Sequence, residues 1–403
     1  MPLHHRRFQP LSGSHPPRFP EASALRGTVA GTYTPPVMTK DRIRLGIVGA
    51  NVDYGWGSKA HLPAILTLPE YELTAVCTAH ADTAAASARR FGARFAYHDY
   101  RAMLANPEID VVTICVRASQ HQEITRAALE AGKHVFTEWP LGGTLAIAEE
   151  MAALARKRRA VTMVGLQGRG SPPLLYFKEL LGQAYIGRVL AASLAVYVER
   201  PTSYVTAQDV ADDPSKGHRV LWIQAGHNID AFCFVLGEFR GLAAFVTTRV
   251  PERHRITSRP DVPGPAPDRI SVTGTLENGA AASILVTTNT TVCGGWRLDV
   301  AGTEGALSAY CPYHFQYGQI TITELRQGGT AYQELPIPPR LVTAPEGTPA
   351  EPPFNVAQLY GRLADGIRTS AGVQPSFEDA VRRHELLAAI QRSADEGTRQ
   401  GPS

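Results

Sequence analysis

The sequence has little of the chemistry that is typical of secreted, metal-binding or membrane proteins. Its 403 residues include only five cysteines, an odd number, and no pair has the spacing of a zinc or redox site. Cys77 and Cys115 lie in apolar runs typical of strands, so we expect buried free thiols in a reducing cytoplasm. No apolar run approaches the roughly 18 residues of a membrane span. We therefore expect neither a bound metal nor a membrane partner.

An excess of charge of one sign is also lacking. The chain has 40 basic and 37 acidic residues, a formal net charge of +3. This balance does not indicate a nucleic acid or an anionic membrane as a partner. A length of 403 residues is sufficient for two domains with sizeable cores.

The first 40 residues differ in composition from the rest of the chain. They are rich in Pro, His, Arg and Ser and lack the apolar core of a secretory signal. We expect a disordered leader over 1–40. The sequence leaves open whether Met1 or Met38 is the natural start.

The stretch 42–61, RIRLGIVGANVDYGWGSKAH, organises the chain. Its first half predicts a buried parallel strand, and a helix is predicted over 59–68. A strand, a glycine turn and a helix direct backbone N–H groups at a phosphate. The spacing differs from G-x-G-x-x-G, since Asn51 follows Gly49 by two residues and the next glycine is Gly55. Because Asn tolerates left-handed backbone, Asn51 is expected to hold the turn of a dinucleotide site. The alternative is a plain βα turn.

Beyond this stretch, the chain divides into two patterns. Strands alternate with helices up to residue 166, which predicts a parallel, doubly wound sheet. The expected elements include helices over 81–91 and 100–104, strands over 95–97 and 134–138, a sixth strand over 161–166 and a later helix over 218–236. Later strands follow one another without helices, which predicts an antiparallel sheet. We expect a dinucleotide-binding Rossmann domain over 41–166. An α/β domain over 167–396, for substrate and oligomerisation, should carry a large, mostly antiparallel open sheet and closing C-terminal helices.

Several motifs resemble the Gfo/Idh/MocA oxidoreductase family over about 42–399. They are GIVGAN with HLPAIL downstream, DVVTICVRASQH, HVFTEWPL and GHNID. The turn G-x-N, the pair GW before a histidine, the pair E-W and the run LQGRGSP are similar to the fungal galactose-regulon repressor branch of that family. The resemblance implies NAD or NADP as cofactor, a carbohydrate-like small-molecule substrate, and homo-oligomers formed through the open sheet.

In the family that it resembles, catalysis usually relies on a Lys in an E-K-P turn and on an Asp four residues before a His. Here the turn is Glu138-Trp139-Pro140, and Ile223 lies four residues before His227. His227 remains as the candidate acid or base, since the pKa of a histidine suits neutral pH. The alternative is a helix histidine packed under the sheet.

The resemblance also implies positions near the cofactor and in the pocket. Cofactor contacts are expected from Trp56, Ser119, His121, Glu138 and Pro140, although Ser119 and His121 could equally cap a helix. His61, after the glycine turn, is as well explained by packing as by function.

The substrate pocket is expected to include Trp139, Arg169 and Asp230. Trp139 is either a stacking platform for a sugar or nicotinamide ring or an apolar plug in an inactive site. For Arg169 the alternative is a solvated loop charge.

The end of the second strand bears on the choice of cofactor. An acidic side chain there would bind the ribose 2′-OH and repel a 2′-phosphate. The sequence instead has Thr78 and His80, which permit NADP as well as NAD. The alternative for Thr78 is a helix cap.

Three functions are consistent with these motifs. The first is an NAD(P)-dependent oxidoreductase that acts on a hydroxyl of a sugar, cyclitol or glycoside. The second is a catalytically inactive regulator that binds NAD(P) and a protein partner. The third is a redox-assisted eliminating glycosidase, which borrows the cofactor transiently. The absent Lys and Asp favour the second, and the prevalence of enzymes in the family favours the first.

Overall fold

The computed structural model describes residues 42–199, 220–249, 267–290 and 292–401. The expected leader over 1–40 lies outside the described residues. Among the helices that lie in these ranges, none has both the length and the apolar character needed to cross a membrane.

The first sheet is parallel and has six strands in the order β3-β2-β1-β4-β5-β6. This is the strand order of doubly wound dinucleotide-binding folds, whose ligands lie outside the carboxyl ends of the strands where the order reverses. Here that point lies between β1 and β4. The strands are β1 (Ile43–Val48), β2 (Tyr71–Cys77), β3 (Phe95–Tyr97), β4 (Val111–Ile114), β5 (His134–Glu138) and β6 (Thr162–Gly165).

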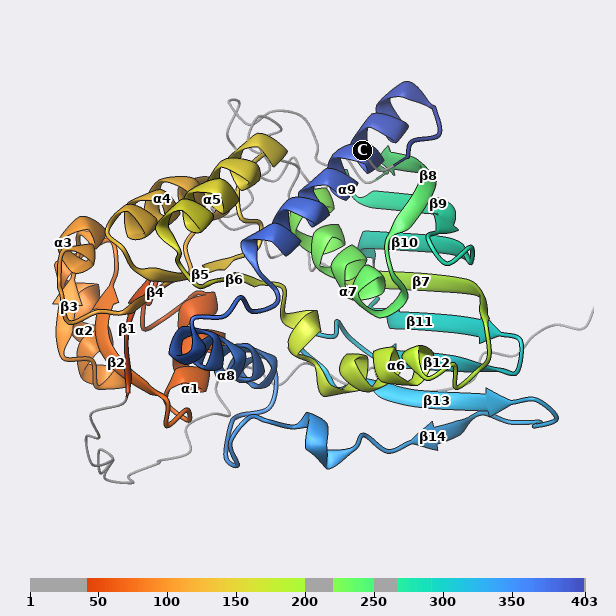
Figure 1. The fold of residues 1–403 in the computed structure, drawn as a ribbon, viewed down its shortest axis with the longest axis horizontal. Coiled ribbons are helices and arrows are strands. Elements are labelled where there is room, and N and C mark those ends of the chain that lie inside the picture. The colour runs from red at the N-terminus through yellow and green to blue at the C-terminus, as the bar shows by residue number, and fades with distance from the viewer. Residues whose placement is uncertain (1–41, 200–219, 250–266, 291, 402–403) are drawn as a thin grey trace, which may run out of the picture. The chain divides into compact units, whose positions relative to one another are not determined.

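Helices cover both faces of this sheet, because its strands carry apolar side chains on both faces (Figure 1). One face packs against α3 (Tyr100–Leu104), α4 (His121–Glu130) and α5 (Leu145–Arg158). The other face packs against α1 (Leu62–Ile65), α2 (Ala81–Phe91) and α8 (Pro353–Thr369).

Helix α8 reaches the first sheet from the far end of the sequence. Its residue Tyr360 is buried, and the hydroxyl of Tyr71 donates to the Tyr360 carbonyl oxygen at 2.8 Å. The boundary predicted at residue 166 stays a prediction, and this part of the expected second domain packs on the first sheet.

The second sheet has eight strands in the order β14-β13-β12-β11-β7-β10-β9-β8. Strands β7 and β10 pair in parallel and the other pairs are antiparallel. The predicted fold class, a Rossmann sheet followed by a mostly antiparallel sheet, is therefore confirmed. The strands are β7 (Val189–Glu199), β8 (Phe239–Thr247), β9 (Arg269–Leu276), β10 (Ala281–Thr290), β11 (Gly295–Gly302), β12 (Gly305–Cys311), β13 (Thr321–Arg326) and β14 (Gln333–Leu335).

Within the described ranges, helices cover one face of the second sheet. Helices α6 (Pro172–Gly182), α7 (Gly226–Leu236) and α9 (Phe377–Glu396) lie on that face (Figure 1). The opposite face exposes small and aromatic side chains, among them Ser193, Tyr197 and Phe245.

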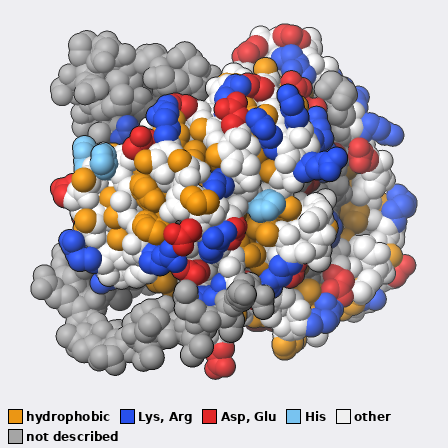
Figure 2. Space-filling model, turned by 60° about the vertical axis from the view of Figure 1, so that its left-hand side comes forward, with side chains coloured by type: hydrophobic (Ala, Val, Ile, Leu, Met, Phe, Trp, Pro, Cys, Tyr) orange, Lys and Arg blue, Asp and Glu red, His pale blue; other side chains and the backbone are white. Residues whose placement is uncertain are grey.

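Charges are mixed on the molecular surface. On the face drawn in Figure 2, Lys and Arg side chains are interspersed with Asp and Glu side chains. As far as the described residues cover this face, it has no broad patch of one sign.

Two predicted helices differ from the observed ones. The helix expected over 59–68 is a π-helix, Gly57–His61, followed by α1, which ends at Ile65. The helix expected over 218–236 is a π-helix, Val220–Ala225, followed by α7, while residues 218 and 219 lie outside the described residues.

Candidate functional site

The turn after β1 contains glycines at positions where a side chain would clash with the backbone or strain it. Gly49 has φ +93°, and a Cβ there would lie 2.1 Å from the carbonyl oxygen of Cys115. A Cβ on Gly57 would lie 2.6 Å from the carbonyl oxygen of Gly49. Gly55 has φ +104° and open space around it. The turn therefore brings bare backbone close to the reversal point of the sheet, which fits a pyrophosphate group.

Asn51 holds this turn in a different way from the one predicted. Among the described residues, the non-glycine positions with positive φ are Arg159, Ala184 and Ser370, so Asn51 is not left-handed. Its side-chain oxygen instead accepts a hydrogen bond from the backbone N–H of Asp53 at 2.9 Å, which closes an Asx-turn. The prediction of left-handed backbone was wrong.

Trp56 precedes the π-helix and carries a buried donor without a partner. No acceptor among the described residues lies within hydrogen-bond distance of its indole Nε1. Its ring meets Tyr317 edge-on, with ring centroids 5.8 Å apart. A buried, unpaired N–H costs free energy, so this position also fits a ligand that supplies an acceptor.

The carboxyl end of β2 has no acidic side chain. The Thr78 hydroxyl lies 2.7 Å from the hydroxyl of Thr83 and donates to the carbonyl oxygen of His80 at 2.9 Å. Thr78 therefore links the strand end to the start of α2, whose first turn carries Asp82.

Ser119 and His121 follow β4. Ser119 is exposed in the 3₁₀ turn Ala118–Gln120. His121 is buried, and its Nδ1 lies 2.6 Å from the carbonyl oxygen of Pro140. Its Nε2 lies 3.1 Å from the carbonyl oxygen of Val116, so the imidazole ties the end of β4 to the turn after β5.

His61, in the π-helix that follows the glycine turn, begins a series of hydrogen bonds. The Nδ1 atom of His61 lies 2.8 Å from the hydroxyl of Tyr360, which also contacts the hydroxyl of Thr113 at 2.8 Å. The Nε2 atom of His61 lies 2.8 Å from Oε1 of Glu138. Helix α8 thereby fixes the imidazole that meets the carboxylate at the end of β5.

The series of hydrogen bonds continues from Glu138 through Gln167 and Gln316 to His227. Nε2 of Gln167 lies 2.9 Å from both carboxylate oxygens of Glu138. Nε2 of Gln316 donates to Oε1 of Gln167 at 2.8 Å and lies 3.4 Å from Nδ1 of His227. Glu138 and His227, two predicted site residues, are thus joined through two amides.

His227, on α7, is deeply buried in this region, with 8% of its surface exposed. Burial lowers its pKa to about 4, although Glu138 and Asp230 act in the opposite direction. The imidazole is therefore neutral at neutral pH and is a weaker base than its residue type predicts.

A second histidine lies next to it. His314 accepts a hydrogen bond from the amide of Asn228 at 3.1 Å, and burial together with His227 lowers the pKa of His314 to about 3.

Trp139 fills the place where the resemblance implies a lysine. It is 4% exposed, and its Nε1 donates to the carbonyl oxygen of Trp222 at 2.5 Å. A Cβ on Gly226 would lie 2.6 Å from that nitrogen. The ring of His384 packs against the indole with a centroid distance of 4.8 Å. Little of the indole face remains for a ligand.

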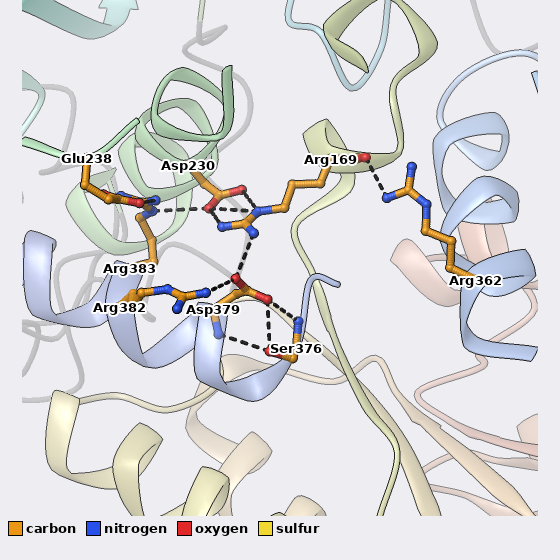
Figure 3. A network of polar contacts seen from close by, with 8 residues as sticks. All are labelled: Arg169, Asp230, Glu238, Arg362, Ser376, Asp379, Arg382 and Arg383. Carbon is orange, nitrogen blue, oxygen red and sulfur yellow. Dashed lines mark hydrogen bonds and ion pairs between the residues drawn. The ribbon is translucent and has the colours of Figure 1, made fainter. Parts of the chain in front are cut away.

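Arg169 and Asp230 lie together in a buried ionic network (Figure 3). Nη2 of Arg169 lies 2.7 Å from Oδ1 of Asp230, and Nη1 lies 3.0 Å from Oδ1 of Asp379. Nε of Arg383 lies 3.2 Å from the same oxygen of Asp230. Arg383 also pairs with Glu238 at 2.8 Å. Each charge thus has a partner of opposite sign within the protein.

The network shifts the ionisation of its members. Burial opposes the charged form of Asp230, but the guanidinium of Arg169 and that of Arg383 outweigh burial and lower the pKa of Asp230. The same holds for Asp379, whose pKa is lowered by Arg169 and by the bonds from Ser376 and Arg382. The network joins the turn after β6, α7 and α9, which is a structural role for Arg169 and Asp230.

Sequence reasoning missed several polar residues of the site, namely Gln167, Asn228, His314, Gln316 and Tyr360. Gln167 lies in LQGRGSP, immediately after the sixth predicted strand. His314 and Gln316 lie in YHFQYG, a short aromatic stretch between β12 and β13. These were the available signals. Within the described part of the chain, no group of three or more His, Cys, Asp or Glu residues is placed to hold a metal.

Two family profiles match consecutive parts of the chain. Residues 43–166 match the oxidoreductase family with an NAD-binding Rossmann fold, GFO_IDH_MocA. Residues 172–309 match the C-terminal domain of Gal80p. The first match confirms the expected pyridine dinucleotide.

Relatives with known names include both enzymes and a regulator. The dehydrogenase aclE of Aspergillus oryzae is 36% identical over 52% of this chain. The galactose/lactose metabolism regulatory protein GAL80 of Saccharomyces cerevisiae is 31% identical over 59% of it. The matches span 59% and 58% of the lengths of these two relatives. Levoglucosan dehydrogenase of Pseudarthrobacter phenanthrenivorans is 28% identical over 66% of the chain and 73% of its own length.

Solved structures share the fold along most of the chain. A levoglucosan dehydrogenase in complex with NADH and levoglucosan has a TM-score of 0.77 at 23% identity, covering 90% of this chain and 99% of its own. A super-repressor mutant of Gal80p has a TM-score of 0.76 at 24% identity, covering 89% and 97%. The protein thus carries a Gfo/Idh/MocA NAD-binding domain followed by a Gal80p-like C-terminal domain, which agrees with the resemblance that its motifs indicated.

Proposed function

We propose that the protein is an NAD(P)-dependent oxidoreductase acting on a hydroxyl-bearing carbon of a sugar, cyclitol or glycoside. The observation that carries the proposal is the hydrogen-bonded connection between Glu138, at the end of β5, and the buried His227 on α7. It links a polar side chain on α7, a helix that packs on the second sheet, to the edge of the first sheet where the glycine turn lies. The relationship to aclE and to levoglucosan dehydrogenase supports the same class.

The cofactor would be held by the turn and the strand ends described above. These are the residues Gly49, Asn51, Gly55, Trp56, Thr78, Ser119, His121, Glu138 and Pro140. The nicotinamide supplies or accepts the hydride in such enzymes. His227 would contact the oxygen of the reacting carbon, while Glu138 and the buried amides would hold the imidazole in place. Because β2 ends at Cys77 and is followed by Thr78 and not by an acidic residue, we propose that NADP binds at least as well as NAD.

Two further properties belong to this proposal. The exposed face of the second sheet would pair with that of another copy, because it carries Tyr197, Phe245 and Tyr310 in the open. The five cysteines are free thiols, which suits a reducing cytoplasm.

A regulator that binds NAD(P) and a protein partner is the second candidate. The observation that favours it is Trp139, which occupies the position of the implied lysine and is held by Trp222 and His384. The indole N–H of Trp139 donates a hydrogen bond, but unlike a lysine amine the indole cannot take up or release a proton near neutral pH. The relationship to GAL80 supports the same alternative.

Reduction of NAD or NADP on a broad panel of polyols and glycosides would test the proposal. We expect a rise in nicotinamide absorbance with at least one compound, and its loss in His227→Ala. His98→Ala, an exposed histidine outside the site, is the matched control and should retain activity. No turnover across the panel, together with tight NADP binding, would refute the enzyme and support the regulator.

A further inference from the structure

Glu138 determines which group donates and which accepts in each hydrogen bond between Glu138 and His227. A carboxylate can only accept hydrogen bonds. Since one terminal atom of Gln167 lies 2.9 Å from both oxygens of Glu138, that atom must be the NH₂ group. The other terminal atom of Gln167 is then the oxygen, which can only accept.

The same logic orients the second amide. The terminal atom of Gln316 that lies 2.8 Å from the Gln167 oxygen must donate, so it is also an NH₂ group. Turning either amide by 180° would place two oxygens, or two NH₂ groups, against each other. The second proton of this NH₂ group is directed at Nδ1 of His227, 3.4 Å away.

A neutral imidazole has one acceptor and one donor nitrogen. With Nδ1 of His227 facing an NH₂ group, the proton of the ring belongs on Nε2. Among the described residues, no group forms a hydrogen bond with Nε2 of His227, and the residue is 8% exposed. The neighbouring Oδ1 of Asn228 is buried and has no partner within the described chain. A ligand with polar groups would pair with the open Nε2 edge of His227, and a buried oxygen without a partner on the next residue of α7 is consistent with such a ligand.

We infer that Glu138 sets the tautomer of His227 from a distance, through Gln167 and Gln316, so that the imidazole presents Nε2–H as a hydrogen-bond donor to a hydroxyl or carbonyl oxygen of the ligand. Gln167 and Gln316 are positioning residues. This inference rests on the proposed function only for the identity of the ligand oxygen. It assigns His227 the part of an oriented neutral donor, a part that an imidazole can take when its environment keeps it uncharged.

Nitrogen-15 NMR of histidine-labelled full-length protein at pH 7 reads the tautomer directly. The resonances of His227 are assigned by their absence in His227→Ala. Long-range proton–nitrogen cross-peaks distinguish Nε2–H from Nδ1–H. We expect the Nε2–H pattern in the wild type and a mixture of tautomers in Gln316→Leu. Gln183→Leu, which alters an exposed glutamine at the end of α6, should keep the wild-type pattern.

A second variant keeps the test decisive if Gln316→Leu folds poorly. Gln316→Glu replaces the NH₂ donor by a carboxylate, which should draw a proton onto Nδ1 of His227. An Nδ1–H pattern in the wild type, or an unchanged pattern in both Gln316 variants, would overturn the inference.

Turnover separates this inference from the proposed function. If the polyol panel identifies a substrate, Gln316→Leu should lower kcat/KM by about tenfold, the loss of roughly one oriented hydrogen bond, with cofactor affinity unchanged. If no substrate is found, the proposed function fails, while the NMR pattern still decides the tautomer.

Discussion

Replacing Asp230 by Asn tests whether the buried network is structural. Asp230 is 1% exposed, and its loss of charge leaves Arg169 with Asp379 and Arg383 with Glu238. Removal of one member of a buried ion pair costs about 3–5 kcal/mol. Because both arginines keep one acidic partner, and Asn keeps an acceptor oxygen, we expect a loss near the lower end, about 3 kcal/mol.

Urea unfolding followed by tryptophan fluorescence measures this loss. The control is Glu123→Gln, which removes an ion pair with Arg101 whose two side chains are 62% and 63% exposed, and it should change stability far less. An Asp230→Asn variant that is as stable as the control would refute the structural role. If the variant kept its stability but lost ligand binding, the pocket role predicted for Asp230 would be favoured instead.

The pH dependence adds an independent check. The folded state lowers the pKa of Asp230 below the value of about 3.9 for an unfolded chain. Its stabilisation is therefore complete above that value and is lost as pH falls through the lower, folded pKa. The stability difference between wild type and Asp230→Asn should stay constant from about pH 8 to pH 5 and shrink only at more acidic pH.

Three further changes probe the glycine turn, the cofactor choice and a buried histidine. Gly49→Ala places a Cβ 2.1 Å from the Cys115 carbonyl oxygen. Calorimetry should therefore detect no NAD(P) binding, and the free energy of unfolding should fall by about 1–3 kcal/mol. Thr78→Asp should weaken NADP about tenfold or more through charge repulsion and leave NAD nearly unaffected, whereas equal effects on both would contradict the assignment. His384 is buried with no partner for either ring nitrogen among the described residues, and its pKa is lowered to about 3. Because the unfolded chain takes up that proton below about pH 6.5, His384→Phe should gain stability relative to wild type as pH falls from 6.5 toward 3, and a pH-independent difference would argue against this.

Local patterns predicted much of the fold. The helices 81–91 and 100–104 and the strands 95–97 and 134–138 have the bounds expected from periodicity and from turn residues. Such elements depend on residues close in sequence. Periodicity did not anticipate the π-helical turn over 220–225, which has the same apolar residues as an α-helix. Strand β14 was not anticipated because its sequence, Gln-Glu-Leu, lacks the aromatic residues that mark the equally short strand 95–97.

The site was harder to predict because its contacts are distant in sequence. Glu138 and His227 stood out through the family motifs, but 149 positions separate Gln167 from Gln316, the amides that join them. Arg169 and Asp230 were both chosen as pocket residues, and their pairing across 61 positions became visible only in the folded chain. Residue type indicated what each side chain can do, while tertiary contacts determined which partner it has.

Helix α8 has a consequence for how this protein folds during its synthesis on the ribosome. Its residues Val356, Leu359 and Leu363 pack in one core with Leu45 and Ile47 of the first strand. The amino-terminal sheet and its helices α1 and α2 are synthesised long before residue 353 emerges, so the part of this face that α8 covers stays exposed until the end of synthesis. A fragment ending at residue 166 would lack α8 and leave the surface around Leu45 and Ile47 partly exposed, which would favour aggregation of the isolated fragment.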